Sequence, residues 1–135
     1  MVEGTEPIED DEELYRRIPV SRYDPEIDPC PSRRAFRPHE YDTNGLSVFR
    51  AKYKKPQEVA RNDRGKRYYV AVLRAGDLRA CGIEVVPSPI PPDDLGHAEL
   101  PGLRYDNRRE TEGLQLLLAE QLCVKVMGPF PQADD

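Results

Sequence analysis

Tryptophan is absent from this sequence, and only three phenylalanines and two histidines occur among its 135 residues. A core without tryptophan must rest on Leu, Val, Ile and Tyr, and the apolar fraction of 38% is low for a globular chain. The three cysteines are far apart and form no CxxC pair, which argues against a disulfide framework and for a reducing compartment. Two histidines and scattered cysteines offer too few convergent ligands for a zinc site, so we expect no metal.

Long apolar runs are missing as well. The sequence contains no stretch of 18 apolar residues and no apolar segment near its start, so it predicts neither a membrane span nor a signal peptide and favours a cytoplasmic protein. Glycine-rich phosphate loops and GxSxG motifs are absent, which argues against nucleotide-triphosphate chemistry and serine hydrolysis.

Charge is distributed unevenly along the chain. Residues 1–15 carry seven acidic groups and no basic one, whereas residues 16–74 carry fifteen basic and seven acidic groups. A run of like charge is typical of a solvated segment, so we expect residues 1–12 to form a disordered acidic arm, although such an arm can also fold back on a basic body. Residues 13–128 are expected to form a single domain and residues 129–135 a disordered tail.

The hydrophobic pattern predicts an α+β fold: a small, mostly antiparallel sheet with two or three helices and long proline-rich loops. Residues 19–44 contain five prolines and are expected to form one such loop. Strands are expected over residues 14–18, 46–49, 68–73, 83–86, 97–100 and 122–127, with 68–73 in a central place. Helices are expected over residues 56–62, 77–81 and 108–121.

The proline-rich loop carries the candidate binding residues. It combines guanidinium groups, which bind phosphate and carboxylate, with aromatic rings, although the same arginines can equally pair with acidic neighbours in the loop. A stiffened loop is partly preorganised for recognition, so we expect a protein partner. Direct nucleic-acid binding is not expected, because no nucleic-acid-binding motif accompanies the charge. The candidate binding residues are Arg33, Arg34, Phe36, Arg37, His39 and Tyr41.

His97 and Glu99 form a second group of interest. They are two residues apart and would face the same way on a strand. A His/Glu pair can serve as a general acid–base pair or hold a ribose hydroxyl group, and it can equally dock a loop through a hydrogen-bonded carboxylate.

Four short motifs occur in a particular order: Leu14-Tyr15-Arg16-Arg17, SRRAFRP over residues 32–38, GLSV over residues 45–48, and His97-Ala98. In this order the sequence resembles a loosely defined set of small bacterial proteins that have no established activity. The resemblance covers about residues 14–100. It implies a component of a bacterial defence or toxin–antitoxin-like system.

The sequence is also similar, more weakly, to ADP-ribosyltransferase-like toxins. These place an arginine on the first strand, a serine on the next and a late Glu or His, and Arg16 (or Arg17), Ser47 and Glu99 (or His97) occur in that order. The similarity implies NAD as cofactor, with the arginine on its phosphates and Ser47 at the nicotinamide ribose. Two function classes therefore stay open: a protein-binding module without cofactor, which we favour, and an NAD-using transferase.

Overall fold

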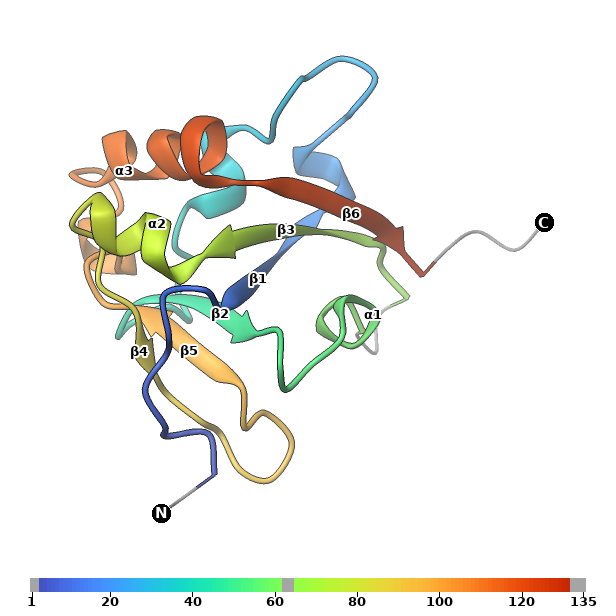
Figure 1. Ribbon diagram of the computed structural model, residues 1–135. Helices are drawn as coiled ribbons and strands as arrows, with labels where there is room; N and C mark the ends of the chain where they lie inside the picture. Colours follow the sequence, from blue (N-terminus) through green and yellow to red (C-terminus); the bar gives the residue numbers. More distant parts are fainter. Residues whose placement is uncertain (1–2, 62–64, 132–135) are drawn as a thin grey trace.

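One six-stranded antiparallel sheet organises the fold in a computed structural model that describes residues 3–61 and 65–131. The order across the sheet is β4-β5-β2-β1-β3-β6 (Figure 1). The α+β prediction is thus confirmed. The strands are β1 (Glu13–Pro19), β2 (Leu46–Arg50), β3 (Tyr68–Arg74), β4 (Val86–Pro87), β5 (His97–Leu100) and β6 (Lys125–Phe130).

Three short α-helices and several tighter turns complete the structure. The last helix begins later than its apolar periodicity suggests, because the chain before it is still closing a turn in which the Thr111 N–H donates to the Asn107 carbonyl oxygen (3.0 Å). The helices are α1 (Pro56–Val59), α2 (Ala75–Ala80) and α3 (Glu112–Leu117), which continues as the π-helical turn η4 (Leu118–Leu122). The 3-10 turns are η1 (Val20–Arg22), η2 (Arg33–Phe36) and η3 (Tyr105–Asn107).

Three strands differ from expectation: β3 and β4, and also β6, which spans Lys125–Phe130 where residues 122–127 were expected. β3 is second from the edge, because β6 adds outside it and leaves β1 and β2 in the middle of the sheet. The strand expected over residues 83–86 is reduced to β4, since Ile83 and Val85 are buried in the core while only Val86–Pro87 pairs with β5.

Alternation of side chains along the strands divides the core into two layers, one on each face of the sheet. The larger layer lies under α2, α3 and η2 and includes Leu14, Phe36 and Leu73, all fully buried. The smaller layer lies under α1, where Val59 packs against Val70 of β3. Figure 1 shows α2 and α3 on one side of the sheet and α1 on the other.

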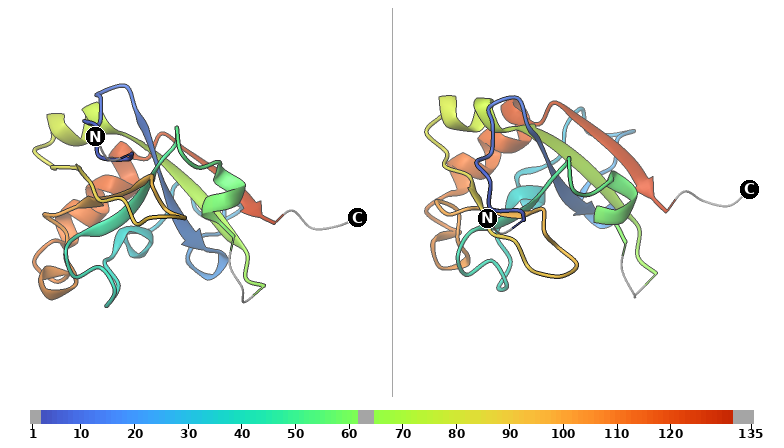
Figure 2. Two further views of the ribbon diagram at one scale, coloured as in Figure 1. Left: turned by 90° about the horizontal axis from the view of Figure 1, so that it is seen from below. Right: turned by 60° about the horizontal axis from the view of Figure 1, so that its bottom comes forward.

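The acidic arm is packed against the rest of the fold, beside the segment that joins β4 to β5 (Figure 2). Ile8 is only 3% exposed and belongs to the larger core layer. Gly4 approaches Leu95 so closely that a Cβ would lie 2.2 Å from the Leu95 carbonyl oxygen. The expectation of a disordered arm is therefore corrected for residues 3–12, while residues 1–2 lie outside the described residues.

Arg50 holds the arm in place. Its guanidinium group is fully buried on the core face of β2 and makes five hydrogen bonds. Nη1 donates to the carbonyl oxygens of Gly4 (3.2 Å) and Glu6 (2.9 Å), and Nη2 to that of Pro7 (3.3 Å). Nη2 and Nε also grip the two carboxylate oxygens of Glu12 (2.8 and 3.0 Å). A buried guanidinium is tolerated only with such compensation, so the arm supplies the charge that β2 requires.

The carboxylates around Arg50 are stabilised in their ionised form. Burial, the largest single effect, raises the pKa of Glu12. The hydrogen bonds from Arg50 and from the Glu9 N–H, together with the charges of Arg50 and Lys52, outweigh it and hold the pKa below its usual value. The Tyr53 hydroxyl group donates to Glu6, and mainly for this reason the pKa of Glu6 falls to about 2. Both groups are therefore negatively charged at neutral pH beside the guanidinium.

The carboxyl-terminal boundary also lies later than expected. β6 continues to Phe130, so Pro129 and Phe130 belong to the sheet and not to a disordered tail over residues 129–135. Residues 132–135 lie outside the described residues.

Candidate functional site

Arg16 is a structural cation. It is 8% exposed and lies on the core face of β1. Its Nε donates to the carbonyl oxygen of Ala35 (3.2 Å) and its Nη1 to that of Ser47 (3.0 Å), so it fastens η2 to β2. Burial lowers the pKa of Arg16 to about 10 against the opposing charge of Asp42, which leaves the group protonated at neutral pH.

Ser47, His97 and Glu99 come together on adjacent strands. The β2–β5 register sets Ser47 opposite Glu99. His97 Nε2 lies 3.1 Å from the Ser47 hydroxyl oxygen, and Nδ1 lies 2.9 Å from the Ser88 carbonyl oxygen and 4.0 Å from the Glu99 carboxylate. The Ser88 hydroxyl group donates to that same carboxylate (2.7 Å). This group therefore joins β2, β5 and the segment after β4.

Asp42 extends the group toward the proline-rich loop. The buried carboxylate accepts hydrogen bonds from the Ser47 hydroxyl (3.0 Å), the Ser47 N–H (3.3 Å) and the His39 N–H (2.7 Å). Because the Ser88 carbonyl can only accept, His97 Nδ1 donates to it, and the single hydroxyl proton of Ser47 is directed to Asp42. A negative charge developing on Ser47 would be repelled by the adjacent carboxylate, which makes this serine a poor nucleophile.

Arg16 does not converge with Ser47, His97 and Glu99, whereas Arg17, the alternative arginine, lies on the opposite face of β1 from Arg16. Ser47, His97 and Glu99 project from one face of the sheet, whereas Arg16 projects from the other and is consumed by backbone carbonyl groups. Catalytic groups must converge on one substrate, so these four side chains do not form a single NAD site.

A hollow of about 470 Å³ lies where the proline-rich loop meets η3. Its lining combines four guanidinium groups, one imidazole, one carboxylate and two phenol rings, and we call it the cationic hollow. The side chains are those of Arg22, Arg34, Arg37, Arg108, His39, Glu40, Tyr41 and Tyr105.

The structure brings four of the predicted binding residues to this hollow. Sequence reasoning missed its other wall, since Tyr105 and Arg108 are some 60 residues further along the chain. They are placed there because the Tyr105 N–H donates to the Asp42 carbonyl oxygen (3.0 Å), a contact that no sequence pattern signals. The predicted residues that line the hollow are Arg34, Arg37, His39 and Tyr41.

Phe36 and Arg33, which were also predicted to bind a partner, lie elsewhere. Phe36 is fully buried in the larger core layer, and Arg33 forms an ion pair with Glu112 of α3 (2.5 Å). Side chains three residues apart share one side of a 3-10 turn. The pair 33/36 therefore faces α3 and the sheet, while the pair 34/37 faces the hollow.

The residues that line the hollow carry a net positive charge. Burial lowers the pKa of His39, and the charges of Arg16 and Arg22 lower it further against the opposing effect of Asp42. His39 is therefore neutral at physiological pH.

Two arginines of the hollow are uncommitted. Within residues 3–61 and 65–131, the side chains of Arg34 and Arg37 make no hydrogen bond or ion pair.

The other two arginines are held in position. Arg22 Nη1 donates to the Arg34 carbonyl oxygen (2.9 Å) and lies 3.5 Å from His39 Nε2. Arg108 Nη1 donates to the Tyr105 carbonyl oxygen (2.7 Å), and its guanidinium carbon lies 3.9 Å from the centre of the Tyr105 ring. Each retains further N–H groups for a ligand, because an arginine has five.

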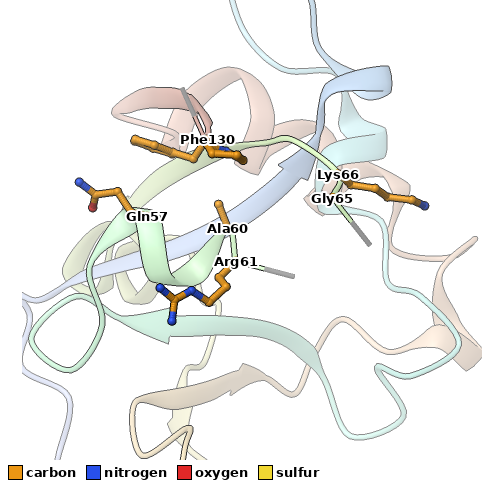
Figure 3. A pocket seen from close by; sticks show the side chains of 7 residues that line it. Gln57, Ala60, Arg61, Gly65, Lys66 and Phe130 are labelled. Carbon is orange, nitrogen blue, oxygen red and sulfur yellow. The ribbon is translucent and has the colours of Figure 1, made fainter. Parts of the chain in front are cut away.

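A second hollow, of about 530 Å³, opens between α1 and β6 (Figure 3). Gln57, Ala60 and Arg61 line one side, and Phe130 lies across from them. Gly65, Lys66 and Pro131 complete the lining, and we assign this hollow no role.

The described part of the chain contains no group of three or more His, Cys, Asp or Glu side chains arranged to hold a metal ion. The helices of this part are also too short and too polar to cross a membrane.

The chain was compared with protein-family models, with curated proteins and with solved structures, and none of the three comparisons gave a match. The two resemblances based on short motifs therefore remain predictions.

Proposed function

We propose that this chain is a cytoplasmic protein-binding module that docks an acidic segment of a partner protein in the cationic hollow. One observation carries the proposal: four arginines and one histidine line this hollow, and Glu40 is the one acidic residue among its lining residues. Charge complementarity of this kind selects a partner and speeds its association. Following the resemblance to small bacterial proteins, we place this partner in a defence or toxin–antitoxin-like system.

The hollow is supported by rigid elements, as a recognition site requires. Phe36 anchors η2 in the core, Pro38 is buried, and Asp42 ties the loop to β2. Side chains presented on such a support lose less conformational entropy on binding. Tyr41, which is 84% exposed, adds apolar contact area at the rim.

A binding experiment tests the proposal. A fluorescently labelled glutamate-rich peptide should bind the wild-type chain, and the Arg34→Gln/Arg37→Gln double variant should bind it about tenfold or more weakly, because charge-assisted hydrogen bonds contribute about 1.5–3 kcal/mol each. The matched control is Arg74→Gln/Arg109→Gln, which removes the same charge from exposed arginines outside the hollow. Fluorescence anisotropy measures all three affinities.

Two outcomes would count against this proposal. An equal loss in the control variant would mean that the peptide senses only net charge. Tighter binding of a single-stranded oligonucleotide than of the glutamate-rich peptide, with the same dependence on Arg34 and Arg37, would indicate a nucleic-acid site instead.

The affinity for the glutamate-rich peptide is expected to depend on pH through His39. The pKa of His39 lies below its usual value in the free protein, and a bound anion would raise it, so binding takes up a proton. The affinity should therefore rise about three- to tenfold between about pH 7.5 and pH 5.5, where glutamate remains ionised. His39→Gln should bind equally at both pH values, and a pH response retained in that variant would assign the proton to another group.

A further inference from the structure

We propose that the anion taken by the cationic hollow is the phosphate monoester of a phosphorylated serine or threonine in the partner protein. This inference rests on the proposed function and specifies the chemistry of its ligand.

The number of cations around the hollow is the first argument. A carboxylate carries one charge on two oxygens and is satisfied by one bidentate arginine. A phosphate monoester carries a charge of about −1.5 to −2 on three acceptor oxygens, so it can engage several guanidinium forks at once. Four arginines around about 470 Å³ fit the compact, more highly charged anion better.

The state of the four arginines is the second argument. Arg22 and Arg108 are already oriented, the first by the Arg34 carbonyl oxygen (2.9 Å) and the second by stacking on Tyr105 (3.9 Å). Arg34 and Arg37 have no hydrogen-bond or ion-pair partner among the described residues. Two oriented guanidinium groups and two unpartnered ones can together bind several oxygens of one phosphate without breaking an existing ion pair.

His39 is the third argument. Its Nε2 lies 3.5 Å from Arg22 Nη1, in an environment that also contains Arg16, Arg17 and the opposing carboxylate of Asp42. A neutral imidazole beside a guanidinium has no anion to bind in the free protein. An incoming dianion would allow the protonated ring to donate to it, which adds one more contact to those of the arginines.

The tyrosines indicate that this phosphate is carried by a protein chain. Tyr41 is 84% exposed at the rim, and Tyr105 forms part of the wall. Exposed rings of this kind offer contact area to the residues on either side of a phosphorylated side chain. A free phosphate ion would leave them unused.

Three peptides of one neutral sequence, with Ser, Glu or phosphoserine at the centre, test the inference by isothermal titration calorimetry. We expect the phosphopeptide to bind at least about tenfold more tightly than the Glu peptide, with no binding of the Ser peptide. Equal binding of the Glu and phosphoserine peptides would overturn the inference and leave the proposed function intact. If the Glu peptide, the phosphoserine peptide and the glutamate-rich peptide all fail to bind, both the inference and the proposed function are overturned.

Two further measurements sharpen the result. Arg37→Lys keeps the charge but removes the planar guanidinium group. It should weaken binding of the phosphopeptide about three- to tenfold and binding of the glutamate-rich peptide less. Arg109→Lys should change neither affinity. Inorganic phosphate should compete only weakly. Competition as strong as that of the phosphopeptide would show that the hollow takes the free ion, and would overturn the protein-borne assignment.

Discussion

Replacing Arg50 with methionine is expected to lower the free energy of unfolding by about 3–5 kcal/mol, because removing one partner of a buried ion pair leaves the other uncompensated. The variant leaves three carbonyl groups of the arm without the guanidinium donor, and it leaves the Glu12 carboxylate with only the Glu9 N–H (3.1 Å) and Lys52 (3.4 Å). The arm would then be held by Ile8, by Arg79, which donates to the Asp10 carboxylate (2.6 Å) and the Ile8 carbonyl oxygen (2.5 Å), and by backbone contacts such as that of the Gly76 N–H with the Asp10 carbonyl oxygen (2.8 Å).

Urea unfolding followed by circular dichroism measures this loss. Arg74→Met is the matched control, since Arg74 is exposed at the end of β3, and it should change stability by no more than about 0.5 kcal/mol. Arg50→Lys keeps the charge without the fork and should fall between the two. Wild-type stability in Arg50→Met would show that the contacts of Arg50 with the arm contribute nothing to the fold.

Replacing Phe36 with alanine is the second large effect, at about 3–5 kcal/mol for a fully buried aromatic side chain. The same change should weaken peptide binding, because η2 carries Arg34 and leads directly into Arg37. Tyr41→Ala is the control from the same loop. Its ring is 84% exposed, so stability should change by no more than about 0.5 kcal/mol.

Thermal unfolding and the anisotropy assay together check this prediction. A stable Phe36→Ala variant with reduced peptide affinity would show that Phe36 contacts the partner after all, as the sequence alone suggested. A destabilised variant that still binds the peptide normally would show that binding in the hollow does not depend on the anchoring of η2 by Phe36.

Strand positions could be predicted well from the sequence, because alternation and β-branched composition are local properties. β1, β2 and β5 lie within one or two residues of their expected bounds. The same alternation contained an unused signal: Leu46 and Val48 face the core, so the next residue in phase, Arg50, must be buried too. A buried arginine requires an anion, and the acidic arm was the richest source of one.

The site was predicted only on the side that is continuous in sequence. Charge and proline content identified the loop, but they could not separate Arg33 and Phe36 from Arg34 and Arg37, because this depends on the 3-10 turn that η2 adopts. Tyr105 and Arg108 reach the hollow through tertiary contacts alone. Convergence of distant residues is set by the packing of the whole sheet, which no local pattern encodes.

The strand order has a consequence for synthesis on the ribosome. β1 is made before the other five strands, yet it lies between β2 and β3, and β6, one of the two edge strands, is made after them. The carbonyl groups of the arm likewise cannot form their hydrogen bonds with Arg50 until Arg50 has been synthesised. Strands that are distant in sequence must pair before the sheet is stable, so the sheet is complete only after β6 has emerged. Nascent chains stalled before β6 should therefore remain open to proteases that the finished protein resists.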